Sequence, residues 1–212
     1  MLISHTHRFI YIVVPRTAST STAAILRSTL KPGVDETRIP VHARAKRVRE
    51  FFPREWESYS KIANIRHPYT RSLSIFSYWL GDFAPQALRE KICRNSAPHL
   101  WTEEYELFLR EKKFPLMWEE KEKGYYFLDD APIDIQLIRY ENLRDSLRQV
   151  SHRFNLALDI ENNLPWHANY GAKKRRWNIL TLMNANAKAF IDEHYDWYFE
   201  RFGYKKEIED AA

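Results

Sequence analysis

The chain has 212 residues, which fits one domain with a sizeable core, and its formal net charge of +5 suits an anionic cofactor or acceptor. A single cysteine, Cys93, excludes an intrachain disulfide and a cysteine-based zinc site. The histidines show no metal-binding spacing, and the sequence contains neither a secretory signal nor an apolar run long enough to span a membrane.

The first informative segment is an apolar run, 9–14, which predicts a buried strand that ends at Pro15. Small and hydroxylated residues follow one cation, Arg16, and a helix is expected over 19–30. A strand, a hydroxyl-rich turn and a helix start direct backbone N–H groups and a helix dipole at one point, which favours a phosphate or related oxyanion. The alternative is an ordinary β-turn-α connection with a Ser/Thr cap. The segment lacks the glycines of a Walker loop.

A loop rich in turn-forming residues, 31–40, precedes an expected helix over 43–52, and the pattern then repeats. Residues 61–66 predict a strand that ends in Arg66, and Pro68 suits the first turn of a helix over 68–80. Arg66 and Ser74 could converge on a second phosphate. The arginine would supply a bidentate pair of hydrogen bonds and the serine a neutral donor. Taken singly, Arg66 could be a surface ion-pair residue and Ser74 a helix filler.

The rest of the chain continues the alternation. A polar insertion reaches about residue 100, helices are expected over 102–112, 141–155 and 184–201, and a strand over 134–139. Strands separated by helices predict an α/β fold with a central parallel sheet, whose ligands lie at the carboxyl ends of the strands. Four cations, Lys173, Lys174, Arg175 and Arg176, follow Gly171 in a loop over 159–176. They could close over phosphates, grip an acidic polysaccharide, or form an ordinary solvated charge run.

In order along the chain, several segments resemble motifs of sulfotransferases that use 3′-phosphoadenosine 5′-phosphosulfate (PAPS). VPRTASTST resembles the 5′-phosphosulfate loop of the carbohydrate-acting branch, in particular of the uronyl 2-O-sulfotransferases. IRHPYTRSLSIFSYW resembles the 3′-phosphate motif RxPxxRxxS. The stretches VHARA, IRYENL, LPWHAN and the terminal FGY are similar to further motifs of that branch. The ordered set covers residues 9 to 204.

The resemblance implies a three-layer, P-loop-like fold in one domain over 1–212, with an acceptor-side helical insertion at 81–130. It implies transfer of a sulfuryl group from PAPS to a hydroxyl acceptor, most simply a saccharide or glycoconjugate, with no metal required. Animal Golgi members carry an N-terminal anchor, so we expect a soluble cytoplasmic enzyme of the bacterial or viral type, unless an anchor has been removed. The implied cofactor-binding residues are Arg16, Thr17, Ala18, Ser19, Thr20, Ser21, Thr22, Arg66, Ser74, Lys173, Lys174, Arg175 and Arg176.

Two residues are the expected catalytic groups. Arg16 stands where the family has a lysine, and it can place positive charge on the departing phosphate. His42 matches the family's histidine position, and a histidine titrates near working pH, which suits a general base. The alternative for His42 is a surface histidine that precedes a helix, and Asp35 and Glu36 are then the fallback bases.

Two other classes of protein remain as alternatives. A P-loop nucleotide kinase would share the sheet and the phosphate loop, but it would need a Walker lysine and magnesium-binding carboxylates. A basic nucleic-acid-binding protein would use the net charge and the cationic run, but no signature of a known nucleic-acid-binding motif is present.

Overall fold

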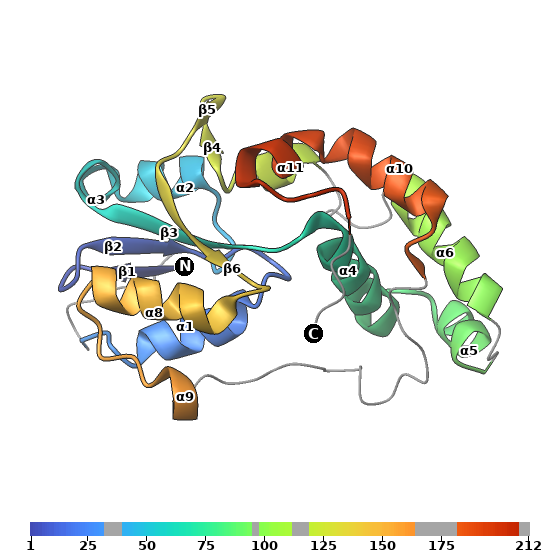
Figure 1. The fold of residues 1–212 in the computed structure, drawn as a ribbon, viewed down its shortest axis with the longest axis horizontal. Coiled ribbons are helices and arrows are strands. Elements are labelled where there is room, and N and C mark those ends of the chain that lie inside the picture. The colour runs from blue at the N-terminus through green and yellow to red at the C-terminus, as the bar shows by residue number, and fades with distance from the viewer. Residues whose placement is uncertain (32–39, 95–97, 112–118, 164–181, 208–212) are drawn as a thin grey trace. The chain divides into compact units, whose positions relative to one another are not determined.

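The computed structural model describes residues 1–31, 40–94, 98–111, 119–163 and 182–207 (Figure 1). These residues belong to two compact units. The first comprises Met1–Arg66 and Glu122–Tyr170, and the second comprises His67–Lys121 and Gly171–Ala212. Assignment of the whole chain to one domain stays a prediction, and each unit is described by itself below.

The first unit is built on a four-stranded sheet of order β1-β2-β3-β6, formed by β1 (Leu2–Ser4), β2 (Phe9–Ile12), β3 (Ser60–Ile65) and β6 (Ile135–Arg139). β2, β3 and β6 are parallel, while β1 is antiparallel to β2. The expected α/β class and the central, mostly parallel sheet are therefore confirmed. The antiparallel edge strand was not foreseen, because three residues are too few to show a periodic pattern.

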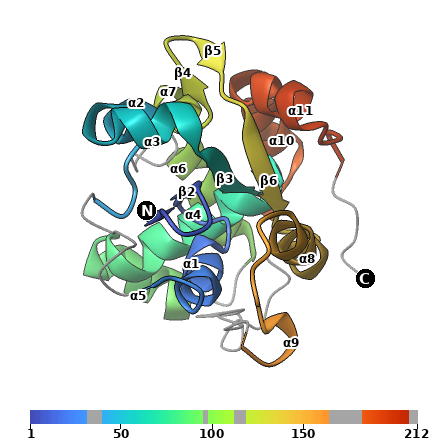
Figure 2. The ribbon, with the colours of Figure 1, turned by 90° about the vertical axis from the view of Figure 1, so that its left-hand side faces the viewer.

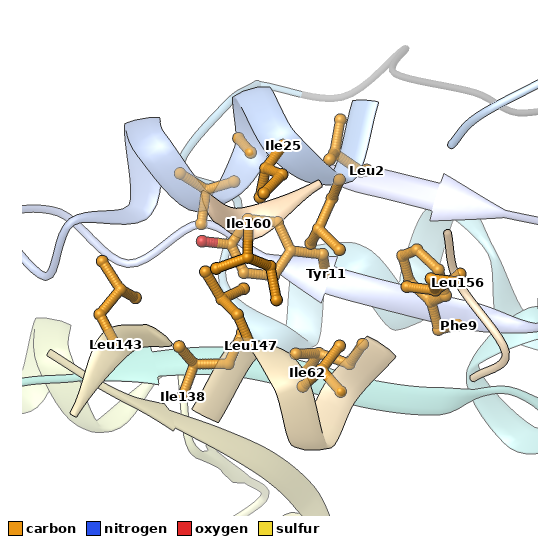
Figure 3. Close-up of a cluster of buried hydrophobic side chains, with 14 residues drawn as sticks. Leu2, Phe9, Tyr11, Ile25, Ile62, Ile138, Leu143, Leu147, Leu156 and Ile160 are labelled. Carbon is orange, nitrogen blue, oxygen red and sulfur yellow. The ribbon is translucent and has the colours of Figure 1, made fainter. Parts of the chain in front are cut away.

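Helices cover both faces of this sheet (Figures 1 and 2). α1 (Ser19–Arg27) and α8 (Leu143–Arg153) lie on one face, and α2 (Ala45–Phe51) with α3 (Pro53–Ser58) lies on the other. The core on the α1/α8 face takes alternate residues of β2, as the two-residue period of a strand requires. Figure 3 shows this cluster, which draws on both helices, on all four strands of the sheet and on the short α9 (Ile160–Asn163).

A short hairpin, β4 (Phe127–Leu128) and β5 (Ala131–Pro132), was also missed by the sequence analysis. Its two turn residues, Asp129 and Asp130, have φ of 51° and 62°. A two-residue hairpin turn with both φ values positive is usually marked by Asn-Gly or Asp-Gly. The Asp-Asp pair forms the same kind of turn, but it is a weaker sequence indication of a hairpin because it contains no glycine.

The helix expected over 43–52 is α2, which is followed directly by α3, a helix that was not predicted, and the last expected helix is divided. Pro53 starts α3 at its first turn, and the preceding Phe52, with φ −133° and ψ 61°, ends α2. Proline disfavours a helical conformation at the residue before it, which accounts for the break. The last expected helix consists of α10 (Ala185–His194) and α11 (Asp196–Phe202), divided at Tyr195.

The second unit is helical and consists mainly of α4 (Pro68–Asp82), α5 (Gln86–Arg94), α6 (Pro98–Arg110), α10 and α11. α10 packs against α4, α6 and α11. The short α7 (Glu119–Lys123) contains the point at which the chain passes back to the first unit. The described residues of 81–130 include α5, α6, α7 and the strand β4, and the expectation of a helical insertion on the acceptor side stays a prediction.

The C-terminal residues of the second unit are bound to the start of α4. Gly203 ends α11 in the left-handed region, with φ 64°. His67 Nε2 lies 2.9 Å from the carbonyl of Lys205, and the Tyr69 hydroxyl lies 3.3 Å from the carbonyl of Lys206. The Tyr69 hydroxyl also donates to Asp192 of α10 over 2.5 Å. These bonds fix the first turn of α4 within its own unit.

The core of the first unit makes a direct prediction about stability. Leu147 of α8 has no exposed surface, so Leu147→Ala should lower the free energy of unfolding by roughly 2–5 kcal/mol. Gln149→Ala, an exposed change on the same helix, should stay within about 0.5 kcal/mol of the parent. Urea unfolding followed by circular dichroism measures both, and equal midpoints for the two variants would contradict the packing described here.

Candidate active site

Three parallel strands end at one edge of the first unit's sheet, and two of the predicted site segments, the turn that begins with Arg16 and Arg66 itself, come shortly after those ends. Ile12 pairs with Ala63, and Ile65 pairs with Arg139, so the strands stop at nearly the same level. The turn 15–18 continues from β2, and Arg66 continues from β3. This is the edge at which parallel sheets hold ligands.

The turn between β2 and α1 uses an uncommon backbone conformation. Arg16 and Ala18 both have φ of 63°, in the left-handed region that residues with a β-carbon seldom adopt. Ala18 is the N-cap of α1, and its methyl side chain provides no capping hydrogen bond. The first intrahelical bond runs from the N–H of Thr22 to the carbonyl of Ala18 at 3.1 Å. The N–H groups of Ser19, Thr20 and Ser21 therefore precede the helical ladder, which makes this end suitable for an oxyanion.

The carbonyl groups around this turn are engaged by side chains. The Thr17 hydroxyl donates to the Val14 carbonyl over 2.8 Å. The amide of Asn64 donates to the Thr17 carbonyl over 3.0 Å and to the Thr22 hydroxyl over 2.9 Å. Acceptors of the turn are thus bound from within the protein, while its helix end carries donors.

Asn64 is the functional candidate that sequence analysis missed. It is fully buried on β3, and its Oδ1 accepts a 2.7 Å hydrogen bond from the hydroxyl of Tyr11 on β2. A single polar residue inside the apolar run 62–65 was the available signal, since a buried amide requires partners. The partners themselves lie 42 to 53 residues away in the chain and could not be read from that run.

The structure brings His42 to the end of β2. Its side chain is exposed, and Nδ1 lies 2.9 Å from the carbonyl of Val13, two residues before Pro15. A carbonyl can only accept, so Nδ1 carries the hydrogen and the neutral ring keeps its lone pair on Nε2. This tautomer is the one in which Nε2 can accept a proton.

Arg66 also contacts this turn. Its guanidinium donates to the carbonyl of Arg16 over 3.4 Å and stacks over the ring of Tyr140, 3.9 Å from the centroid. The N–H of Tyr140 donates to the carbonyl of Ile65 over 2.9 Å, which holds Tyr140 at the end of β6 beside Arg66. The arginine is therefore oriented by both the turn and the adjacent strand.

The remaining predicted residues are not brought to this edge by any described contact. Ser74 lies on α4 in the second unit, and its convergence with Arg66 stays a prediction. Asp35, Glu36 and the cationic run 173–176 lie outside the described residues. Within the described part of the chain, no group of three or more His, Cys, Asp or Glu side chains is placed to hold a metal ion. Nor does any helix described here have the length and apolarity needed to cross a membrane.

A comparison with protein families identifies a match. The family model described as "Sulfotransferase family" matches residues 1–205, nearly the whole chain. No curated protein and no solved structure matches the chain significantly.

The left-handed conformation of Ala18 can be tested by the order of two substitutions. Ala18→Gly relieves a strain of about 1–2 kcal/mol but gains chain entropy when unfolded, so stability should change little. Ala18→Val adds a β-branched side chain in the same conformation and should be clearly less stable than Ala18→Gly. Thermal unfolding measures the difference.

Ala189, an exposed residue inside α10, is the matched control. In a right-handed helix glycine is less stable than valine by a few tenths of a kcal/mol, so the order of the two substitutions should reverse there. Glycine less stable than valine at both positions would contradict the left-handed conformation at Ala18.

Proposed function

The chain belongs to the sulfotransferase family, and on that basis we propose that it moves a sulfuryl group from PAPS to a hydroxyl group of a carbohydrate. The observation that carries the proposal is the pairing of an uncapped helix start with a histidine of fixed tautomer at the end of the same strand. The first suits the anionic donor, and the second suits removal of a proton from the acceptor.

The donor would lie along the carboxyl edge of the sheet. In the proposal, the segment Arg16–Thr22 binds the 5′-phosphosulfate through its N–H and hydroxyl groups. Arg66 binds the 3′-phosphate with its fork, assisted by Ser74. The cations Lys173, Lys174, Arg175 and Arg176 close over the phosphates. Support comes from the position of Arg66, whose guanidinium is held 3.4 Å from the carbonyl of Arg16.

Arg16 is proposed to act on the leaving group. Negative charge builds on the bridging oxygen as the sulfur–oxygen bond of the donor breaks, and a fixed cation beside that oxygen lowers the barrier. Arginine supplies charge and two hydrogen bonds but, unlike the usual lysine, it cannot donate its proton outright. The proposal is consistent with its backbone, which with φ 63° forms part of the turn that would bind the phosphosulfate.

His42 is proposed as the general base. The acceptor oxygen attacks sulfur in line with the departing oxygen, its proton passes to Nε2 of His42, and a new sulfur–oxygen bond replaces the one that breaks. The 2.9 Å bond from Nδ1 to the Val13 carbonyl supports this role, because it keeps Nε2 unprotonated in the neutral ring. The carbohydrate acceptor rests on the resemblance of the phosphosulfate loop to that of the carbohydrate-acting branch.

Calorimetry with three ligands tests the proposal against its alternatives. Adenosine 3′,5′-bisphosphate should bind without magnesium, whereas ATP with magnesium and a random oligonucleotide should bind far more weakly. Preference for ATP with magnesium would indicate a kinase-like phosphotransferase, and preference for the oligonucleotide would indicate a nucleic-acid-binding protein.

Arg66→Ala should weaken binding of adenosine 3′,5′-bisphosphate by about tenfold to a hundredfold, since a charged hydrogen bond contributes roughly 1.5–3 kcal/mol. Binding of AMP, which has no 3′-phosphate, should change much less. Arg144→Ala, on the exposed surface of α8, is the control and should alter neither affinity. Equal losses for the two nucleotides would remove Arg66 from the 3′-phosphate site.

His42→Ala should lower sulfuryl transfer by roughly a hundredfold to ten-thousandfold, the usual contribution of a general base. Binding of the bisphosphate should stay nearly unchanged, because the proposed donor contacts do not involve His42. The loss is measured as the rate of transfer from PAPS to a panel of polysaccharides, detected by the release of adenosine 3′,5′-bisphosphate.

Three controls accompany this variant. His152→Ala, exposed at the end of α8, should keep full turnover. Asp35→Asn and Glu36→Gln should have mild effects. An inactive carboxylate variant together with an active His42→Ala would move the base from the histidine to that carboxylate.

A further inference from the structure

Two fully buried polar side chains lie beside the β2–α1 turn and take no part in the proposed chemistry. Tyr11 of β2 and Asn64 of β3 have no exposed surface. Their hydrogen bonds reach the first turn of α1 and the residue before its N-cap. Burying polar groups in an apolar core costs free energy unless they are hydrogen-bonded, and a fully bonded pair holds the groups that it contacts in one geometry.

We propose that Asn64 and Tyr11 are positioning residues that set the anion-binding geometry of the donor loop, Arg16–Thr22. This inference rests on the proposed function and deepens it. The two side chains orient the peptide groups of the loop, so that the loop presents N–H groups to an oxyanion.

The hydrogen bonds of the Asn64 amide leave it one orientation. Both Nδ2 hydrogens are used, one on the Thr17 carbonyl at 3.0 Å and one on the Thr22 hydroxyl at 2.9 Å. Oδ1 accepts from the Tyr11 hydroxyl at 2.7 Å. A flipped amide would set Oδ1 against the Thr17 carbonyl, two acceptors without a hydrogen between them.

Tyr11 makes the second attachment to the loop. Its hydroxyl has one hydrogen, which it donates to Oδ1 of Asn64 over 2.7 Å, and the carbonyl of Ser19, the first residue of α1, accepts the same hydrogen as the longer branch of a three-centre bond at 3.2 Å. Burial raises the pKa of this hydroxyl well above its ordinary value, so it remains a donor throughout the working pH range.

These attachments control the N–H groups because a trans peptide is planar, with its C=O and the following N–H on opposite sides. A Thr17 carbonyl directed at Asn64 therefore turns the N–H of Ala18 the opposite way. The longer branch from Tyr11 to the Ser19 carbonyl favours a fixed orientation of the peptide that carries the N–H of Thr20, while the main action of Tyr11 is to hold Asn64 in place. If either peptide rotated, a carbonyl dipole would replace an N–H where the anion binds.

The chain offers a matched pair of variants to test this. Tyr11→Phe removes the hydroxyl that reaches the loop. Tyr126→Phe removes a buried hydroxyl that donates over 2.9 Å to the main-chain carbonyl of Asn64, and not to the side-chain amide that bonds to the Thr17 carbonyl. Each change removes one buried neutral hydroxyl, so the melting temperatures of the two variants should fall by similar amounts.

Binding of three probes separates a positioning role from a structural one. Tyr11→Phe should weaken adenosine 3′,5′-bisphosphate and inorganic pyrophosphate by about threefold to tenfold, the worth of one neutral hydrogen bond. It should leave 3′-AMP, which has no group for the loop, unchanged. Tyr126→Phe should preserve the wild-type affinity for all three probes. Asn64→Leu, where it folds, should show a larger loss of the same two ligands.

The outcomes distinguish this inference from the proposed function. Equal affinities of Tyr11→Phe and Tyr126→Phe, in a protein that binds the bisphosphate, would overturn the inference and leave the proposed function standing. Wild-type binding of pyrophosphate that depends on Tyr11, without binding of the bisphosphate, would support the positioning role and overturn the PAPS assignment. A wild type that binds none of the probes would overturn both.

Discussion

Main-chain carbonyl groups that follow β2 need hydrogen-bond donors. The candidate site depends on how the protein supplies these donors. The strand ends at Ile12, so the carbonyls that follow are no longer served by the sheet. His42 donates to Val13, Thr17 to Val14, and Asn64 to Thr17. One requirement thereby places the histidine beside the loop and turns the loop's acceptors inward, leaving its donors at the helix start.

The two ends of the proposed donor site differ in how they are built. The loop depends on buried neutral partners within the first unit, whereas Arg66 is oriented by stacking on Tyr140 at the end of β6. Its neighbour His67 begins the second unit, caps α4 and bonds to Lys205 near the C-terminal end of the described chain. The start of the helix that carries Ser74 is thus fixed within its own unit by residues far along the sequence.

The sequence predicted those elements whose signals are local. The strand–turn–helix segments around Pro15 and Arg66 combine an apolar run with a proline or a cluster of hydroxyls, and both match the structure to within a few residues. β1 and the β4–β5 hairpin are too short for a periodic pattern, and Tyr195 divides the last helix without a glycine or proline. The Asn64 network escaped prediction for another reason, since its partners come from other elements and only the folded sheet brings them together.

The bond between His42 and Val13 has a consequence for the reorganisation energy of proton transfer. Nδ1 carries a hydrogen in the neutral tautomer described here and also in the imidazolium, so the 2.9 Å bond to the carbonyl persists when Nε2 gains a proton. The ring can therefore pass between its two charge states without rotating about its side-chain bonds. In the proposed reaction, proton uptake and release by His42 would then occur in a polar environment that is already arranged before the acceptor arrives.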